Sequence, residues 1–173
     1  MDGEIVFALV DVYTQGRWIK KNMRLEKEDG ALFRYRQKRI THWDEVALKL
    51  DTWKGWGGYY HKRLIQIYQY LVAPGQRVLE IGCGMGDLLS ALKASVGIGV
   101  DFSEEMVKRA RQRHPELHFI LADAHELNLN EKFDVIILSD LLNDLWDVQT
   151  VFEQIASLSN PHTRIIINSY NRL

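Results

Sequence analysis

The chain has 173 residues, of which 46% are hydrophobic and 26% are charged, a composition typical of one globular domain and not of a disordered or fibrous protein. Its single cysteine, Cys83, excludes an intrachain disulfide framework and fits a reducing compartment. The opening MDGEIVFALVDVY has acids where a signal peptide needs basic residues, and no apolar run approaches the ~18 residues of a membrane helix. We therefore expect a soluble, cytoplasmic protein.

The net charge of -1 conceals a basic segment. Residues 17–39 contain nine Lys or Arg and three acids, so this stretch carries +6 and the remainder carries -7. In LFRYRQK, Phe33 and Tyr35 alternate with Arg34 and Arg36, which predicts a strand with an aromatic face and a basic face. Two interpretations stay open: a solvated outer face over a small core, or contact with an anionic substrate or a nucleic acid, although no named nucleic-acid-binding module is present.

Residues 1–40 are predicted to form a β-rich extension. The run EIVFALVDVY, from Glu4 to Tyr13, is apolar and β-branched, and Asp29-Gly30 is a strong hairpin-turn dipeptide between two strand-like runs. We expect a small antiparallel meander in this segment. Residues 41–173 form the second predicted unit.

From Thr41 the pattern becomes helical and then alternates. Thr41 can cap HWDEVALKL, KGWGG interrupts the chain, and residues 59–72 carry one apolar stripe that Pro74-Gly75 ends. The elements expected after that are strand 77–81, helix 87–93, strand 96–101, helix 104–113, strand 118–122, strand 133–139, helix 148–158 and strand 164–168. Apolar strands spaced by helices indicate a doubly wound parallel sheet that is covered on both faces.

Three glycines alternate with two other residues at positions 82–86, between a predicted buried strand and a helix. Glycine costs about 0.5–1 kcal/mol relative to alanine in regular structure, so this density indicates either a tight turn or a close ligand. Asp101 ends the next strand, about 20 residues further on, where a carboxylate can accept both hydroxyls of a ribose. Nothing in the local sequence suggests a structural role for Asp101, whereas the acids that follow it complement a helix dipole.

Four motifs together resemble the class I S-adenosylmethionine-dependent methyltransferases: VLEIGCGMGDLL, GVDFSEEMV, LADAHEL and FDVIILSDLLNDLWD. The resemblance covers about residues 77–172. It implies a Rossmann-like, doubly wound, mostly parallel sheet that is truncated here after the fifth strand, with S-adenosylmethionine as the cofactor and methyl transfer as the activity. This cofactor has no pyrophosphate, so the third glycine of a dinucleotide fingerprint is not required, which counts against a nicotinamide or flavin enzyme.

The resemblance also implies which residues hold the cofactor. Glu80, Gly82, Cys83 and Gly84 would contact its methionine part, and Asp101 would hold the ribose. Phe102, Asp123 and Ala124 would bind the adenine, and Ser139 would lie beside the sulfonium. GWGGYYHKRL is similar to the segment that folds over the cofactor in many members, which makes Tyr59, Tyr60 and His61 candidates for the roof of the site, although both tyrosines fit core packing equally well. No metal is expected.

Methyl transfer also requires a general base where the acceptor must lose a proton. His61 and Asp140 are the first candidates, followed by His125 and Asp144. Each has a structural alternative: His125 can simply belong to a loop, and the two aspartates can cap the turn before the next helix.

The acceptor and the end of the sheet are the least specified features. A complete class I sheet has two further strands, without which RIIINSY would be an exposed apolar edge, so we expect a C-terminal continuation or a partner, such as a second copy, to cover it. TRIIINSYNRL also resembles sequences in which a methyltransferase module precedes a glycosyltransferase, which implies a sugar-containing or lipid-linked acceptor.

The main prediction is therefore methyl transfer to a small molecule. The alternatives are a cofactor-binding or non-catalytic fragment of a larger protein, and a nucleic-acid methyltransferase. SDLLND stands where amino-methylating nucleic-acid enzymes often have an NPPY-type signature, which counts against the last alternative.

Overall fold

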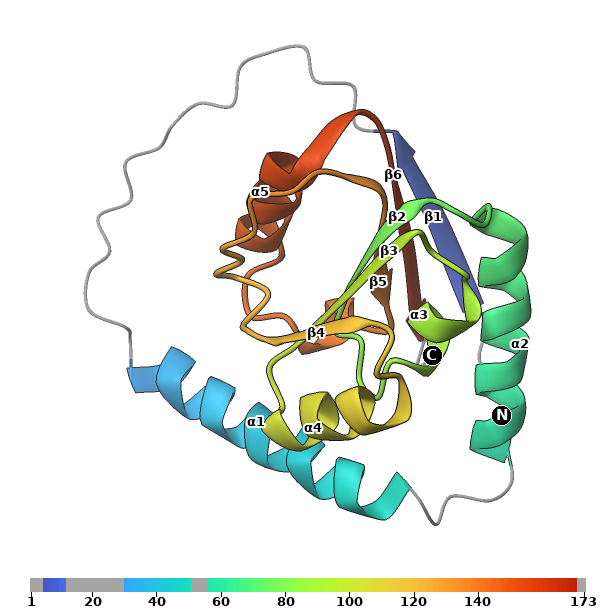
Figure 1. The fold of residues 1–173 in the computed structure, drawn as a ribbon. Helices are drawn as coiled ribbons and strands as arrows, with labels where there is room; N and C mark the ends of the chain where they lie inside the picture. The colour runs from blue at the N-terminus through green and yellow to red at the C-terminus, as the bar shows by residue number, and fades with distance from the viewer. Residues whose placement is uncertain (1–4, 12–29, 51–55, 171–173) are drawn as a thin grey trace.

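In a computed structural model of the chain, the residues described are 5–11, 30–50 and 56–170. They form a six-stranded sheet in the order β1-β6-β5-β2-β3-β4 (Figure 1). The strands are β1 (Ile5–Asp11), β2 (Arg77–Ile81), β3 (Val96–Asp101), β4 (His118–Leu121), β5 (Phe133–Ser139) and β6 (Ser159–Tyr170). The helices are α1 (Gly30–Leu50), α2 (Trp56–Leu71), α3 (Asp87–Ala91), α4 (Glu104–Arg113), the short 3-10 helix η1 (Leu142–Asp144) and α5 (Val148–Leu158). The strands from β2 to β6 are mutually parallel, which confirms the predicted Rossmann-like α/β class.

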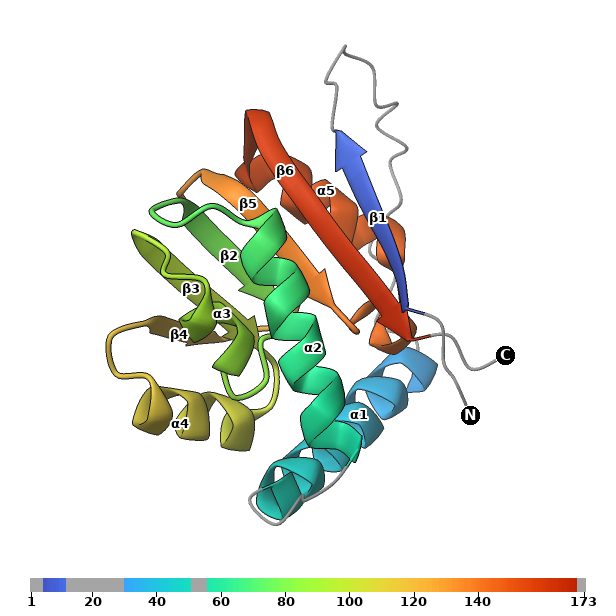
Figure 2. The ribbon, with the colours of Figure 1, turned by 90° about the vertical axis from the view of Figure 1, so that its right-hand side faces the viewer.

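Both faces of the sheet are covered, which explains why its inner strands are apolar at almost every position. Helices α2, α3 and α4 lie on one face of the sheet and α5 lies on the other (Figure 2). Val78 and Ile137 pack among side chains of α2, α3 and α4, whereas Leu79 and Ile136 pack against α5. All four residues are fully buried. A strand that is covered on two faces needs apolar side chains in both of its alternating positions, and this requirement produced the continuous apolar runs seen in the sequence.

β1 lies at the edge where the sequence predicts an exposed apolar strand. It pairs antiparallel with β6 along its whole length, from Ile5 opposite Tyr170 to Asp11 opposite Arg164. The prediction of an open edge beside β6 is therefore wrong, because the chain's own N-terminal strand covers it. The apolar run at the start of the sequence does predict a strand, but periodicity carries no information about a pairing partner at the other end of the chain.

α1 replaces part of the β-rich structure predicted for residues 1–40. The sequence predicts a strand after Asp29 and a helix capped by Thr41, but one uninterrupted helix runs from Gly30 to Leu50. The predicted boundary at residue 40 falls inside this helix. The rest of the predicted meander, between β1 and α1, lies outside the described residues.

The prediction of a strand after Asp29 was wrong because it assumed that the arginines, which alternate with aromatic residues, all face the solvent. In α1 the partly or fully buried side chains include Tyr35, Arg39, Trp43 and Ala47, which recur at the four-residue spacing of a helix. Arg39 belongs to this inner face because its guanidinium pairs with an acidic side chain. A pattern based on hydrophobicity alone cannot assign such an arginine to the inside.

α1 lies across the edge of the sheet at which the parallel strands end (Figure 2). Its Trp43, Val46 and Ala47 pack with Met85 of the glycine loop and Met106 of α4. This apolar cluster fixes the C-terminal half of α1, so the N-terminal half extends over the carboxyl ends of the strands. Among the helices of the described ranges, none has both the length and the apolar composition that crossing a membrane needs.

Proline substitutions in β1 test its pairing with β6. Alternate N–H groups of an edge strand point toward the partner strand and away from it, so only one of the neighbours Ala8 and Leu9 donates to β6. We expect one of Ala8→Pro and Leu9→Pro to lower the free energy of unfolding by about 1–3 kcal/mol, because a carbonyl of β6 loses its donor. The other should have a much smaller effect. Urea denaturation measures both, and equally small effects would contradict the pairing.

Candidate functional site

The glycine loop between β2 and α3 brings backbone close to the ends of two strands. The N–H of Gly82 donates to the carbonyl oxygen of Val100 at 2.8 Å. Gly84 and Gly86 both have positive φ, 53° and 77°. A Cβ at Gly86 would lie 2.4 Å from the ring of Phe119, whereas a Cβ at Gly84 would meet no atom within 4 Å. Gly86 therefore permits helix–sheet packing, and the open space beside Gly84 is where a ligand can approach the backbone.

Asp101, the last residue of β3, ties the end of its strand to the glycine loop. Its Oδ2 accepts from the N–H of Gly84 at 2.8 Å, and its Oδ1 accepts from the N–H of Ser103 at 2.9 Å. The residue is only 7% exposed, and burial raises the pKa of its carboxyl while the backbone hydrogen bonds oppose the rise. The sequence suggests no local structural role for Asp101, and this is wrong, because the carboxylate joins two segments of the site.

Asp123, in the loop after β4, is held by its neighbour His125. Its Oδ1 accepts from the backbone N–H of His125 at 2.9 Å and lies 2.5 Å from Nδ1 of the same residue. Nε2 of His125 accepts from the N–H of Asp147 at 3.2 Å, so the ring proton belongs on Nδ1 and is donated to Asp123. Burial pushes the pKa of Asp123 upward, but the hydrogen bonds from His125 and the charge of Arg36 outweigh it, and the pKa is lowered.

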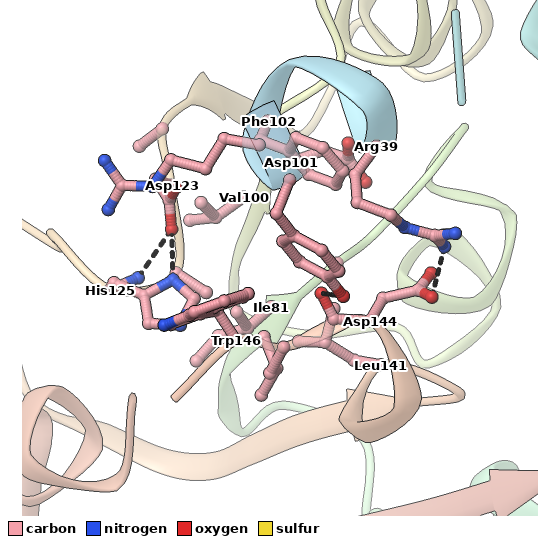
Figure 3. Close-up of a pocket in the computed structure, with 16 residues that line it drawn as sticks. Arg39, Ile81, Val100, Asp101, Phe102, Asp123, His125, Leu141, Asp144 and Trp146 are labelled. Carbon is pink, nitrogen blue, oxygen red and sulfur yellow. Dashed lines mark hydrogen bonds and ion pairs between the residues drawn. The ribbon is translucent and has the colours of Figure 1, made fainter. Parts of the chain in front are cut away.

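A pocket lies between these loops and α1 (Figure 3). Five residues predicted to hold the cofactor line it: Gly82, Asp101, Phe102, Asp123 and Ala124. Tyr35, Arg36 and Arg39 of α1 line it as well. The cavity volume is about 40 Å³, whereas pockets that enclose small ligands have roughly 300–1,000 Å³. The side chains of α1 thus occupy part of the space that a ligand would need.

Acidic residues anchor α1 over the pocket. Nε of Arg36 lies 3.2 Å from Oδ2 of Asp123, and Arg39 forms an ion pair with Asp144. Oδ2 of Asp144 also accepts from Nε1 of Trp43 at 2.9 Å. The two arginine side chains are 23% and 24% exposed. They are therefore better shielded from water than the arginines of exposed surface pairs, which contribute about 0–1 kcal/mol.

Asp140, directly after β5, lies in a hydrogen-bond network. Its Oδ2 accepts from the hydroxyl of Tyr60 and its Oδ1 from Nδ2 of Asn168, both at 2.7 Å. Oδ1 of Asn168 in turn accepts from the hydroxyl of Tyr68 at 2.6 Å, and these last two residues are fully buried. Burial raises the pKa of Asp140, while the Tyr60 hydrogen bond and the charge of His61 oppose the rise. The network fixes a carboxyl of raised pKa at the end of β5.

Glu80 is a buried carboxyl next to the glycine loop. The residue is 2% exposed, and within the described part of the chain its Oε2 makes no hydrogen bond. Burial raises its pKa to about 8, against an opposing hydrogen bond from the backbone of Leu89. The side chain is therefore mostly protonated at neutral pH, and its unpartnered oxygen is a buried polar atom that a ligand can satisfy.

The other predicted site residues lie outside the pocket lining. Cys83 is buried in the glycine loop, and Ser139 ends β5 beside Asp140. At the start of α2, Tyr59 is 68% exposed and His61 is exposed as well. Successive residues of a helix point about 100° apart, so only one of residues 59, 60 and 61 faces the site. This residue is Tyr60, whose hydroxyl donates to Asp140.

The sequence did not lead us to assign Arg39, Trp146 or Asn168 to the site, and it suggested Arg36 only as a possible contact for an anionic partner. The rings of Tyr35 and Trp146 lie 5.2 Å apart at the pocket. Asn168 could have been recognised from the sequence, because this polar residue directly follows the apolar run III, residues 165–167, at the end of a predicted strand. The arginines carried no such signal, since their orientation depends on α1 being a helix.

Comparisons with known proteins agree with this geometry. The model of a family described as a methyltransferase domain matches residues 73–173. Ubiquinone biosynthesis O-methyltransferase of Coxiella burnetii is 30% identical over 117 residues, which cover 64% of this chain and 50% of that protein. The chain thus spans about half the length of this curated relative.

Two solved structures illustrate the fold. The PH0226 protein of Pyrococcus horikoshii is 26% identical, with a TM-score of 0.56 over 62% of this chain and 57% of that chain. The N-methyltransferase NodS of Bradyrhizobium japonicum, in complex with S-adenosyl-L-homocysteine, is 21% identical, with a TM-score of 0.55 over 63% of this chain and 59% of that chain. At the latter identity the likeness concerns the fold alone.

The pH dependence of stability reports on Glu80. The unfolded side chain loses its proton near pH 4.5 and the folded one near pH 8, so between these values the folded state binds one more proton. The free energy of unfolding therefore falls as the pH rises through this window, by at most about 1.4 kcal/mol per pH unit. Glu80→Gln keeps the shape but cannot titrate.

We therefore expect the stability of Glu80→Gln, relative to the wild type, to increase steadily from about pH 5 to about pH 8. Urea denaturation at several pH values measures this difference. A difference that does not change with pH would contradict the raised pKa.

Proposed function

The chain belongs to the family of methyltransferase domains, and we propose that it transfers a methyl group from S-adenosylmethionine to a hydroxyl group of a small molecule. The observation that carries this proposal is the meeting of the glycine loop with the buried carboxylate of Asp101, where the N–H of Gly84 lies 2.8 Å from Oδ2. Open backbone at the end of one strand and a carboxylate at the end of the next are the features with which a parallel sheet holds a ribose and its substituent.

The chemistry of the site fits the proposed cofactor. Asp101 would accept the ribose hydroxyls, Asp123 would accept the adenine amino group, and Phe102 and Ala124 would border the adenine ring. The unpartnered Oε2 of Glu80 supports a role next to the methionine part, whose ammonium group is a hydrogen-bond donor. When bound, S-adenosylmethionine supplies a methyl group on a positively charged sulfonium.

Asp140 is the proposed general base. A hydroxyl acceptor must lose its proton as it gains the methyl group, and a carboxyl whose pKa is raised by burial is a stronger base than one in water. Tyr60 and Asn168 hold this carboxyl at the end of β5, next to Ser139, which the family resemblance places at the sulfonium. His61 has weaker support, because it is exposed. The remaining task of the protein is to orient the reactants and to exclude water.

The proposal of an oxygen acceptor is supported by the curated relative from Coxiella burnetii, which is named an O-methyltransferase. A sugar-containing or lipid-linked acceptor is proposed only on the resemblance of the C-terminal segment to fusions with glycosyltransferases. A cytoplasmic location likewise stays a prediction from the sequence.

The observations that motivated the two alternative functions look different in the structure. The open sheet edge behind the fragment hypothesis is covered by β1, while the chain spans about half the length of its curated relative. The nucleic-acid hypothesis was motivated by the basic segment, but Arg36 and Arg39 face acidic residues at the pocket and so present no phosphate-binding surface. The basic residues before Gly30 lie outside the described part of the chain.

Calorimetric titration with S-adenosylmethionine, S-adenosylhomocysteine and NAD tests the cofactor. We expect micromolar binding of the first two and no binding of NAD, because the glycine loop does not have the spacing that a pyrophosphate requires. A folded chain that binds neither sulfur compound, or that binds NAD, would contradict the proposal.

Asp101→Asn tests the ribose contact. The substitution removes the charge but keeps the size of the side chain, so we expect cofactor affinity to fall at least about tenfold, in line with the ~1.5–3 kcal/mol of a charge-assisted hydrogen bond. Asp134→Asn is the matched control, since Asp134 accepts from the N–H of Arg77 at the opposite end of the sheet. Calorimetry measures both affinities and circular dichroism verifies folding. Equal affinities of the two variants would rule out the ribose contact.

Tyr60→Phe tests the environment of the proposed base. The hydroxyl of Tyr60 donates to Asp140 and lowers its pKa, so its loss should raise that pKa further. Carbon-13 NMR of the labelled carboxyl measures the pKa without any acceptor. Tyr59→Phe removes the neighbouring hydroxyl, which lies on an exposed side chain, and should leave the pKa unchanged. An identical pKa in both variants would show that the hydrogen bond does not act on Asp140.

A further inference from the structure

Both oxygens of Asp123 are already engaged by the protein. His125 holds Oδ1 through its backbone N–H and its Nδ1, and Nε of Arg36 lies 3.2 Å from Oδ2. The imidazole is itself fixed by the N–H of Asp147, so the Oδ1 side of the carboxylate cannot easily be vacated. A ligand that donates a hydrogen bond to Asp123 therefore meets Arg36 at Oδ2.

The same helix also occupies the space next to this carboxylate. The pocket has a cavity volume of about 40 Å³ and is lined by Tyr35, Arg36 and Arg39 of α1 (Figure 3). The ring of Tyr35 contacts that of Trp146 with centroids 5.2 Å apart, and its hydroxyl donates to the carbonyl oxygen of Asp144 at 3.1 Å. A group as large as adenosine can enter only when these side chains of α1 have moved.

We propose that Arg36 competes with the cofactor for the carboxylate of Asp123, so that the N-terminal half of α1 withdraws from the pocket when the cofactor binds. This inference rests on the proposed function, in which the adenine amino group donates to Asp123. Arg36 then lowers cofactor affinity, because its ion pair with Asp123 must break each time the cofactor binds. While this ion pair is formed the pocket is closed, so only a fraction of the chains is competent to bind.

Two features make this exchange feasible. Oε1 of Glu126 lies 3.8 Å from Nη2 of Arg36, and the Glu126 side chain is 72% exposed, so the guanidinium can stay near a carboxylate as it moves outward. The C-terminal half of α1 is held separately, by the packing of Trp43 and Ala47 against Met106. A displacement of the N-terminal half therefore leaves the apolar anchor of the helix in place.

Titration of S-adenosylhomocysteine into the wild type, Arg36→Gln and Arg34→Gln tests the competition. Both variants lose one positive charge from the same helix, but Arg34 is exposed and does not line the pocket. We expect Arg36→Gln to bind about fivefold more tightly than the wild type, and Arg34→Gln to bind equally. In an Asp123→Asn background, which already lacks the ion pair, Arg36→Gln should give no gain.

Hydrogen exchange gives a second readout, on the full chain. In the wild type, S-adenosylhomocysteine should accelerate amide exchange in residues 30–40, whereas protection there would overturn the withdrawal. If Arg36→Gln binds no more tightly than the wild type while both bind, the competition is overturned and the proposed function stands. If no variant binds, the proposed function and this inference fall together.

Discussion

The parallel pairing of β3, β2, β5 and β6 determines where the candidate site lies. Because these strands run in one direction, their carboxyl ends meet at one edge, and each delivers a polar or flexible residue there: Gly82, Asp101, Asp140 and Asn168. Asp101 joins its strand to the glycine loop, and Asn168 holds Asp140. Several of the groups that hold the strand ends together are thus also the groups that we propose for binding and catalysis.

Electrostatics at this edge follows from the burial of carboxyl groups. Burial raises the pKa of Glu80, Asp101 and Asp140, whereas the pKa of Asp123 is lowered because its imidazole and guanidinium neighbours outweigh burial. The carboxylates of Asp101 and Asp140 favour a cation over an anion at this edge, which agrees with a sulfonium and an ammonium group in the proposed cofactor. Arg36 and Arg39 of α1 pair with Asp123 and Asp144, so part of the basic segment serves to neutralise acidic residues at the pocket.

The sequence was sufficient to predict the helices and strands in which burial determines whether each residue is apolar or polar. β2, β3, β5, α4 and α5 have the predicted bounds, because burial on both faces of a sheet or one face of a helix constrains each position. The partner of β1 and the orientation of Arg36 and Arg39 could not be predicted, since both depend on segments far away in the chain. The choice between Tyr59 and Tyr60 depended on how α2 is rotated, which is fixed by packing and not by spacing.

The pairing of β1 with β6 places an unusual demand on synthesis. β1 is translated before β2, β3, β4 and β5, whereas its partner β6 follows all of them in the chain. At roughly 5–20 residues per second, on the order of ten seconds separate the two. During this interval β2, β3, β4 and β5 can already assemble, while the apolar residues of β1 wait without their partner. β1 therefore has no partner until β6 has been made, and during that time its unpaired edge is open to aggregation.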